Sequence, residues 1–377
     1  MLVLEDRTTF RGTAYGAEGE AFGEAVFNTG MTGYQETLTD PSYCRQIVAM
    51  TAPHIGNTGT NDEDNESRRI WVSGFVIRDP SPIASSWRAA RSLDDELRSA
   101  GVAAIAISGT RALTLHLRER GAMRAAISTI SADPAELAGR ILASPPMTGA
   151  DLAREVTTKE PYQVAPPDGM PVRFRVAALD LGIKAATPIA MARLGCEVHV
   201  LPASSTAQEI LAANPDGVFF SNGPGDPAAC WYAVDAMRGV LSAGIPVFGI
   251  CLGSQVLGLA LGLSTYKLRF GHRGVNQPVR DLRTGRVQIT SHNHGFAVAM
   301  PDVGGARVSA NAAVGFDTEF GPAEVTHVNL NDGVVEGLRL LAAPAFAVQY
   351  HPEAAPGPHD AAGLFGDFRD AMERRRA

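Results

Sequence analysis

The stretch Pro246-Val-Phe-Gly-Ile-Cys251-Leu-Gly-Ser-Gln255 runs from one apolar segment through a turn of small residues into a second apolar segment. The first segment predicts a buried strand and the second, Leu252–Leu261, predicts a buried helix. Cys251 lies at their junction, where the glycines allow a close turn and the next backbone N–H faces a developing oxyanion. The helix N-terminus also favours a thiolate. Cys251 is therefore a candidate nucleophile, and the alternative is a small buried hydrophobe.

A candidate proton acceptor follows another predicted strand near the end of the chain. The segment Phe346-Ala-Val-Gln-Tyr-His351-Pro-Glu353 carries a histidine and a glutamate two residues apart. Because residues two apart in an extended backbone share a face, Glu353 can orient His351 and stabilise its charged form. A His-Pro-Glu run alone is weak evidence, since such side chains on a loop are usually solvated. Together with Cys251, it indicates nucleophilic chemistry in one domain.

A glycine-rich loop, Ser221-Asn-Gly223-Pro-Gly225-Asp-Pro227, follows the predicted strand Gly217–Phe220. Its glycines let the backbone approach a ligand, and its N–H groups can help to hold an oxyanion. Taken alone, the loop is equally typical of an ordinary Pro/Gly turn. It lacks the spacing and the Lys-Ser/Thr pair of a phosphate-binding P-loop, so it does not predict a nucleotide site.

Strands that alternate with helices surround these segments. The predicted strands are Arg175–Leu179, Glu197–Leu201, Gly217–Phe220 and Pro246–Ile250, and the predicted helices are Ala185–Leu194, Ala207–Ala213, Trp231–Ser242 and Leu252–Leu261. This alternation predicts an α/β fold with a doubly wound, mainly parallel sheet, whose ligands bind beyond the carboxyl ends of the strands. Val287–Thr290, Glu324–Val328 and Phe346–Gln349 are expected to continue the sheet, and Ala361–Arg374 is expected to form a closing helix.

The amino-terminal part of the chain has a different pattern. Its short apolar runs are separated by Gly, Asn, Asp and Ser turns, which predicts a mixed α+β domain. Four prolines and further turn residues gather between Glu155 and Pro171. A chain of 377 residues also exceeds the ~250–300 at which one core stops growing. We therefore predict an N-terminal domain at 1–153, a linker at 154–171 and a second domain at 172–377.

Composition narrows the classes of partner and compartment. A formal net charge of −7 disfavours nucleic acid and anionic membranes as partners. Four cysteines without a CxxC pair argue against a disulfide framework and a structural zinc site. The segment 1–10 has charged residues where a signal peptide needs an apolar core, and the apolar segment 244–263 contains proline, glutamine and five glycines. We expect a cytoplasmic chain without a membrane span.

The three motifs GICLGSQ, SNGPGDP and QYHPE resemble those of the class I (triad) glutamine amidotransferases. Two further segments, 267–278 and 291–296, are similar to those of carbamoyl-phosphate synthase small subunits. In the amino-terminal half, segments 27–43, 51–57 and 74–78 are similar to the opening domain of the same family, so the resemblance spans nearly the whole chain. One departure is Ser254, at a position that usually holds histidine in this family. There we expect altered packing or hydrogen bonding rather than lost activity.

The resemblance implies a role for each matching residue. Cys251 would attack the side-chain amide of L-glutamine, His351 would act as base and then acid, and Glu353 would support His351. The implied contacts to glutamine are Ser42, Gly223, Gly225, Leu252, Gln255, Asn293, Gly295 and Phe296. Leu252 would act through its backbone N–H, and Ser42 implies that both domains contribute to the glutamine site.

The resemblance also implies a partner. A large subunit would use the ammonia, bicarbonate and two ATP to make carbamoyl phosphate for pyrimidine and arginine biosynthesis, in a heterodimer or a larger assembly. ATP and Mg²⁺ are expected on that subunit, and no cofactor is expected on this chain. The alternatives are the amidotransferase subunit of another synthetase, an inactive regulatory subunit and a Cys/His peptidase. The amino-terminal half argues against the first, and the glutamine-binding segments argue against the last.

Histidines outside the triad receive a structural interpretation. His54, His116, His199 and His327 are expected to be structural or solvated. His272, His292 and His294 lie in Gly/Asn-rich segments, interpreted as loops near the site. Because their spacings match no zinc motif, we predict no metal on this chain.

Overall fold

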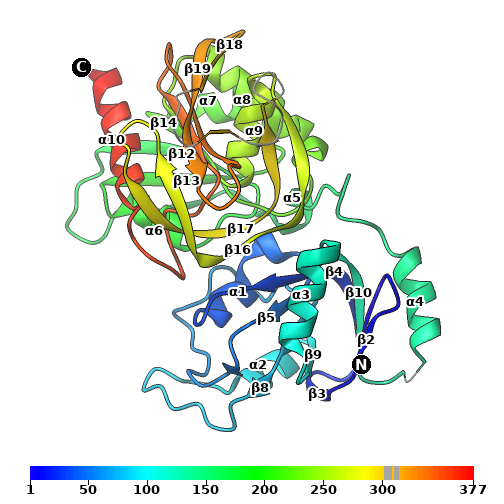
Figure 1. Cartoon of the computed structure of the whole chain (residues 1–377). Helices are drawn as coiled ribbons and strands as arrows, with labels where there is room; N and C mark the ends of the chain where they lie inside the picture. The colour runs from blue at the N-terminus through cyan, green and yellow to red at the C-terminus, as the bar shows by residue number, and fades with distance from the viewer. Residues whose placement is uncertain (132, 301–307, 310–313) are drawn as a thin grey trace. The chain divides into compact units, whose positions relative to one another are not determined.

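The computed structural model describes residues 1–131, 133–300, 308–309 and 314–377. The chain divides into two compact units (Figure 1). The first unit contains Met1–Ala150 and Arg269–Gly274, and the second contains Asp151–Leu268 and Val275–Ala377. Among the described residues, no helix combines the length and the apolar character needed to cross a membrane.

The first unit is built on a sheet whose described strands follow the order β2-β1-β10-β4-β5-β7-β9-β3. These strands are β1 (Leu2–Leu4), β2 (Thr9–Phe10), β3 (Thr13–Gly16), β4 (Glu20–Asn28), β5 (Gln46–Met50), β7 (Gly74–Ile77), β9 (Ala103–Ala106) and β10 (Met123–Ser128). A small parallel pair, β6 (His54–Ile55) and β8 (Asp79–Pro80), lies outside it. The helices are α1 (Tyr34–Thr39), the 3₁₀ turn η1 (Pro41–Tyr43), α2 (Leu93–Ser99), α3 (Thr110–Arg120) and α4 (Pro134–Ala143).

Both faces of this sheet are covered because successive strand residues point to opposite sides. On β5, Val48 packs into a core with Leu38 of α1, whereas Ile47 packs into a second core with Leu117 of α3. Strands β4, β5, β7 and β9 pair in parallel, and the outer strands pair antiparallel. The prediction of a mixed α+β first domain is confirmed.

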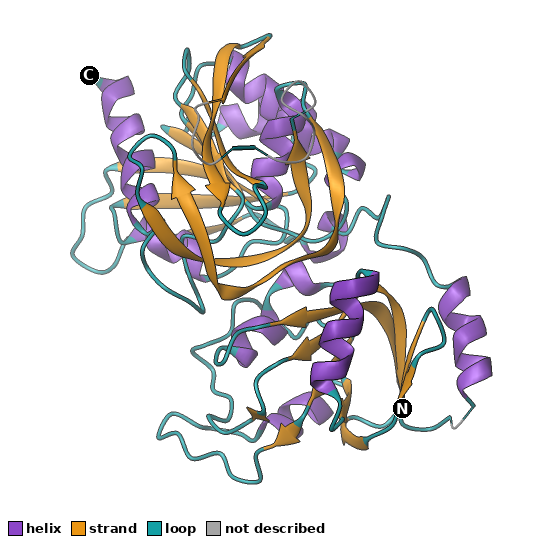
Figure 2. Cartoon of the chain, in the orientation of Figure 1, coloured by secondary structure: helices purple, strands orange, loops and turns teal. Residues whose placement is uncertain are grey.

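The second unit contains a larger sheet with helices on both sides (Figure 2). Its strands are β11 (Tyr162–Val164), β12 (Phe174–Asp180), β13 (Cys196–Pro202), β14 (Gly217–Phe220), β15 (Val247–Ile250), β16 (Ser264–Asp281), β17 (Val287–Ala299), β18 (Val314–Thr318), β19 (Gly321–Asn329), β20 (Val335–Leu340) and β21 (Ala345–Val348). Its helices are α5 (Ala153–Val156), α6 (Ala186–Ala192), α7 (Ala207–Ala212), the 3₁₀ turn η2 (Pro227–Ala229), α8 (Trp231–Ser242), α9 (Leu252–Ala260) and α10 (Gly363–Arg376). The middle of β16, Arg269–Gly274, is counted with the first unit.

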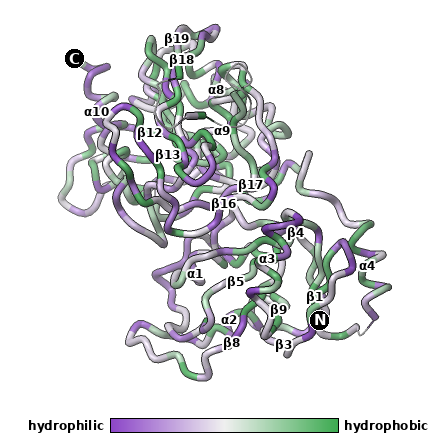
Figure 3. Tube along the Cα trace, in the orientation of Figure 1, coloured by the Kyte–Doolittle hydropathy of each residue, from purple (hydrophilic) through white to green (hydrophobic). Residues whose placement is uncertain are grey.

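The central strands of this sheet, β13, β12, β14, β15 and β21, run parallel in that order. Phe220 packs into the core that contains α8 and α9, and Phe219 packs into the core that contains α6 and α10. Figure 3 shows hydrophobic segments along the strands inside each unit. This arrangement confirms the predicted doubly wound, mainly parallel α/β sheet. It also brings the carboxyl ends of β14, β15 and β21 to one edge.

Two long strands correct the sequence interpretation. The segments containing His272, His292 and His294 were expected to be loops, but they lie on β16 and β17. Glycine and asparagine in these segments hid the strands, because the pattern of turn residues outweighed the intervening β-branched and aromatic residues. In addition, β11 lies within the expected linker and pairs antiparallel with β13.

Candidate active site

Cys251 lies in a sharp turn between β15 and α9. Its backbone has φ 54° and ψ −102°, a conformation that a non-glycine residue rarely adopts. The two neighbouring glycines are required by space, because a Cβ on Gly249 would lie 2.8 Å from the carbonyl carbon of Gly253, and one on Gly253 would lie 2.2 Å from the carbonyl oxygen of Phe220.

The Cys251 thiol is buried and donates to the carbonyl of Asn293, with 3.6 Å between Sγ and O. It stands at the N-terminus of α9, the positive end of the helix dipole. Burial raises the pKa of Cys196 and of Cys230 to about 12, so both stay protonated thiols at neutral pH.

His351 and Glu353 follow the end of β21. His351 Nδ1 lies 2.6 Å from Glu353 Oε1, and both side chains are fully buried. The backbone N–H of His351 donates to the carbonyl of Ser291 at 2.9 Å, which fixes the segment against β17. With Nδ1 bound to the carboxylate, Nε2 of His351 remains for a reacting group.

Lys184 is a member of this group that the sequence interpretation missed. Its Nζ lies 3.3 Å from Glu353 Oε1 and donates to the carbonyl of Ala355 at 2.7 Å, and its side chain is 4% exposed. Lysine is almost never buried without a partner. A lysine directly after the apolar run Leu181–Ile183, at the end of a predicted strand, was the available signal.

The charges of this group perturb one another. Burial lowers the pKa of His351, but the carboxylate of Glu353 and the neighbouring Cys251 side chain outweigh it and raise that pKa to about 10. Burial raises the pKa of Glu353, but Lys184 and His351 outweigh it and lower that pKa to about 2. The side chains therefore favour a protonated His351 between two acidic groups.

The glycine-rich loop after β14 packs close to the turn that contains Cys251. A Cβ on Gly223 would lie 2.0 Å from the carbonyl oxygen of Leu181 and 3.0 Å from Leu252 Cδ2, and Gly225 has φ 92°. The backbone N–H of Gly253 donates to the carbonyl of Ser221 at 3.0 Å. The loop is thus held against the start of α9, as an oxyanion site requires.

Other predicted glutamine contacts lie on α9 and β17. Gln255 Nε2 donates to the carbonyl of Phe296 at 2.8 Å and to Gln349 Oε1 at 3.0 Å. Asn293 accepts from the Cys251 thiol, and Gly295 lies between Asn293 and Phe296 on the same strand. The predicted glutamine contacts on α9 and β17 therefore lie on elements that hydrogen bonds join to each other.

Ser42 belongs to the first unit. It is buried in η1, and its backbone N–H donates to the carboxylate of Asp40 at 2.8 Å. Ser254, the departure from the family pattern, is buried in the first turn of α9, and its N–H donates to the carbonyl of Cys251 at 3.1 Å.

The chain is similar to known proteins over nearly its whole length. Residues 2–127 match the family model of the carbamoyl-phosphate synthase small chain, CPSase domain, and residues 177–371 match the class-I glutamine amidotransferase model. The carbamoyl phosphate synthase small chain of Streptomyces avermitilis is 62% identical, over 100% of this chain and 97% of that protein. The small chains of Mycobacterium tuberculosis (strain H37Rv) and Bifidobacterium longum (strain NCC 2705) are 58% and 53% identical, each over 99% of this chain and over 98% and 94% of their own lengths. The chain therefore belongs to the carbamoyl-phosphate synthase small-chain family, with a class I glutamine amidotransferase domain.

Proposed function

We propose that Cys251, His351 and Glu353 carry the glutamine-hydrolysing activity of this carbamoyl-phosphate synthase small chain. The main support is the buried His351–Glu353 pair, at 2.6 Å, beside a cysteine held in a strained turn at a helix N-terminus. Structural cysteines need neither the strain nor the pair.

In the proposed reaction, the Cys251 thiolate attacks the side-chain amide carbon of L-glutamine. The oxyanion that forms is held by the backbone N–H of Leu252 and by the Gly223–Gly225 loop. His351 holds the thiol proton and donates it to the nitrogen as the C–N bond breaks, which releases ammonia and leaves a γ-glutamyl thioester. His351 then takes a proton from water, the hydroxide displaces the thiolate, and glutamate leaves.

Glu353 and its neighbour Lys184 have supporting roles in this proposal. Glu353 stabilises the imidazolium form of His351, and Lys184 compensates the charge of Glu353 in a buried environment. Glutamine itself is proposed to contact Ser42, Gln255, Asn293, Gly295 and Phe296. Lys184 acts through Glu353, so it is a positioning residue rather than a catalytic one.

The proposal includes a partner. The relatives are named small chains of carbamoyl phosphate synthase, which supports a large chain as the partner. The proposed complex is a heterodimer, or a larger assembly of heterodimers, in the cytoplasm. That large chain would bind ATP and Mg²⁺ and combine the ammonia with bicarbonate, and this chain would need no cofactor. The match of residues 2–127 to the small-chain domain disfavours a role as the amidotransferase subunit of a different synthetase. The complete Cys-His-Glu set disfavours an inactive regulatory subunit.

The test is glutamate release from L-glutamine by the purified chain, wild type beside Cys251→Ser, with and without the large chain of the same organism. We expect release that rises with the partner and is lost in Cys251→Ser. Release that survives Cys251→Ser would contradict the assignment of the nucleophile. No release with partner, ATP and bicarbonate present would favour a regulatory subunit.

A further inference from the structure

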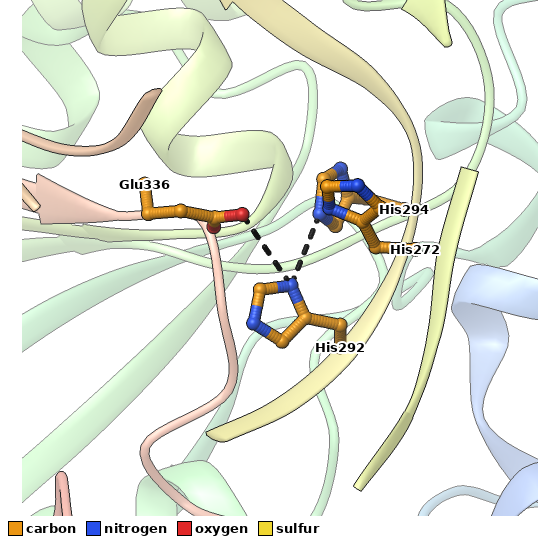
Figure 4. A group of neighbouring side chains, drawn as sticks. All are labelled: His272, His292, His294 and Glu336. Carbon is orange, nitrogen blue, oxygen red and sulfur yellow. Dashed lines mark hydrogen bonds and ion pairs between the residues drawn. The ribbon is translucent and has the colours of Figure 1, made fainter. Parts of the chain in front are cut away.

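A second group of buried histidine and glutamate side chains lies in the second unit, apart from the triad. His292 and His294 project from β17, and Glu336 projects from β20 (Figure 4). His292 Nδ1 lies 3.2 Å from His294 Nε2 and 3.7 Å from Glu336 Oε1. The side chains of His292 and Glu336 are fully buried. Figure 4 also draws His272, which is counted with the first unit.

The hydrogen bonds of His294 fix where its proton lies. Its Nδ1 is 2.8 Å from the carbonyl oxygen of Phe296. A carbonyl oxygen only accepts, so Nδ1 carries the proton and donates it. In the neutral ring, Nε2 therefore presents a lone pair, and this is the nitrogen that faces His292.

The hydrogen bonds of His292 allow the same arrangement on the other side. The hydroxyl of Thr290 lies 2.9 Å from the carbonyl oxygen of Gln277 and 2.8 Å from His292 Nε2. When the hydroxyl donates to the carbonyl, His292 Nε2 donates to the hydroxyl oxygen, and Nδ1 of the neutral ring presents a lone pair. When the hydroxyl donates to Nε2 instead, Nδ1 carries the proton and donates it to His294 Nε2, at 3.2 Å.

In the first of these two tautomers, the lone pairs of His292 Nδ1, His294 Nε2 and Glu336 Oε1 converge, and the ligand atoms of the three residues lie within 4.8 Å of one another. A metal ion bound between them would stabilise that tautomer, whereas in the other tautomer the proton on His292 Nδ1 occupies the same place. The separations fit a metal. Ligands at ~2.0–2.1 Å around a tetrahedral zinc ion lie about 3.3 Å from one another. The observed 3.2 and 3.7 Å bracket that spacing.

We infer that His292, His294 and Glu336 form a binding site for a divalent transition-metal ion, with zinc the ion that it fits. Two imidazoles and a carboxylate are ligands that zinc accepts. The outward nitrogen of each ring is already held, by Thr290 and by the carbonyl of Phe296, as metal-binding histidines usually are. Glu336 Oε1 is oriented in the same way by the amide of Asn329, at 3.1 Å.

The position of the site gives the metal a structural role. Asn293, the residue between the two histidines, accepts the hydrogen bond of the Cys251 thiol. The backbone carbonyl of Glu336 accepts from the N–H of Gln349, two residues before His351. A metal would therefore tie β17 to β20 and stabilise the strands that carry both contacts. This inference stands independently of the proposed function.

The absence of a sequence motif explains why no metal was expected. His292 and His294 are two residues apart, as suits a shared face of a strand, but Glu336 lies 42 residues beyond His294 and comes from a different strand. Zinc motifs that can be recognised from sequence place ligands in close pairs on either side of a loop. The expectation of a metal-free chain is therefore revised by this proposal.

The experiment measures metal binding by the full-length chain directly. Zinc content is determined after purification without chelator, and Co²⁺ is titrated into the metal-depleted protein while its visible ligand-field absorption is followed. The variants are Glu336→Gln and His292→Gln. The matched control is His327→Gln, because His327 is equally buried and its ring also packs on Tyr350, at 5.6 Å between centroids, but it is outside the site. Every titration is repeated in the Cys251→Ser background, which removes the catalytic thiol as a competing ligand.

We expect one ion per chain, a tetrahedral Co²⁺ spectrum, and affinity at least about 100-fold weaker in Glu336→Gln and His292→Gln than in His327→Gln. Near-ultraviolet circular dichroism checks that each variant is folded. If a variant does not fold, the Co²⁺ titration of the wild-type chain still tests whether the site binds a metal ion. No stoichiometric ion and no tetrahedral spectrum in the wild type would overturn the inference and assign the place between the side chains to a proton of His292. Binding that is lost in Cys251→Ser, or unchanged in Glu336→Gln, would also overturn it.

Discussion

Two buried sets of histidine and glutamate in the second unit differ in how the ring nitrogens are used. In the triad, Nδ1 of His351 is bound to Glu353 and the other nitrogen remains for chemistry with Cys251. In the group on β17 and β20, the outward nitrogens of His292 and His294 are held by Thr290 and by the backbone, and the inward ones face each other. In the two proposals, the same residue types thus serve as a proton carrier in one place and as metal ligands in the other.

The two glutamate carboxylates, Glu353 and Glu336, also differ in their charged neighbours. The Glu353 carboxylate lies between two cations of this chain, Lys184 and the protonated His351. Glu336 instead lies 3.7 Å from Nδ1 of His292 and accepts from the amide of Asn329. The partner of each ring nitrogen, rather than burial or residue type, therefore distinguishes the proposed catalytic histidine from the proposed metal ligands.

The largest expected effect comes from substituting one histidine in each set. His351→Asn should lower the kcat of glutamine hydrolysis about 10²- to 10⁴-fold, because it removes the acid and base of the reaction. His292→Asn, which leaves the triad intact, should lower kcat less than about 10-fold. Steady-state kinetics of both variants would check this, and equal losses would break the distinction between the two sets.

Removal of the cation beside Glu353 should have the next largest effect. Lys184→Met leaves a buried carboxylate without one of its two positive neighbours, and breaking such a pair costs about 3–5 kcal/mol of unfolding free energy. Urea unfolding monitored by circular dichroism gives the value. The control is Lys159→Met, an exposed lysine, which should change stability by less than about 0.5 kcal/mol. Similar results for both lysines would remove Lys184 from the account.

The pH dependence of stability tests the charge states of the triad. Glu353 has a lowered pKa, so its contribution is present above the ordinary glutamate value of about 4.3 and is lost as pH falls toward about 2. His351 has a raised pKa, so its contribution is present below about 6.5 and is lost as pH rises toward about 10. The difference in unfolding free energy between wild type and Glu353→Gln should therefore be largest between these ordinary values and shrink on both sides.

Unfolding series at several pH values, with proton NMR of His351 as a second readout, measure that difference. In Glu353→Gln the pKa of His351 should fall toward its ordinary value. A pKa of His351 that does not change in the variant would show that Glu353 does not stabilise the imidazolium form.

The smallest effect on activity is expected at the second set. Glu336→Gln keeps the size of the side chain and leaves Cys251, His351 and Glu353 unchanged, so kcat should stay within about threefold of wild type. Stability should fall by about 1–3 kcal/mol, because a buried hydrogen-bonded carboxylate is replaced. Parallel kinetic and unfolding measurements check the two values. A kcat loss as large as that of His351→Asn would mean that the two sets act as one.

The sequence already indicated the proposed triad, because each of its parts is local. Cys251 lies in a strand-turn-helix pattern, and His351 and Glu353 are two residues apart. The parallel sheet followed from alternating strands and helices, and its topology brings the carboxyl ends of β15 and β21 together without further information.

The remaining features depend on contacts that local patterns do not encode. Lys184 meets Glu353 across 169 residues of sequence, and Glu336 meets His292 across 44. The long strand β16 was hidden because its glycines resemble turn residues, although Gly271 has φ 72° within the strand. Long-range charge compensation and long irregular strands therefore had to be seen in the structure.

The most direct test of the central claim is to trap the γ-glutamyl thioester. The wild-type chain, with its large chain present, is mixed with labelled L-glutamine, quenched in acid and digested, and the labelled peptide is identified by mass spectrometry. We predict label on the peptide that contains Cys251, and none on the peptides of Cys44, Cys196 or Cys230. Label on another cysteine, or glutamate release without any thioester, would contradict the account.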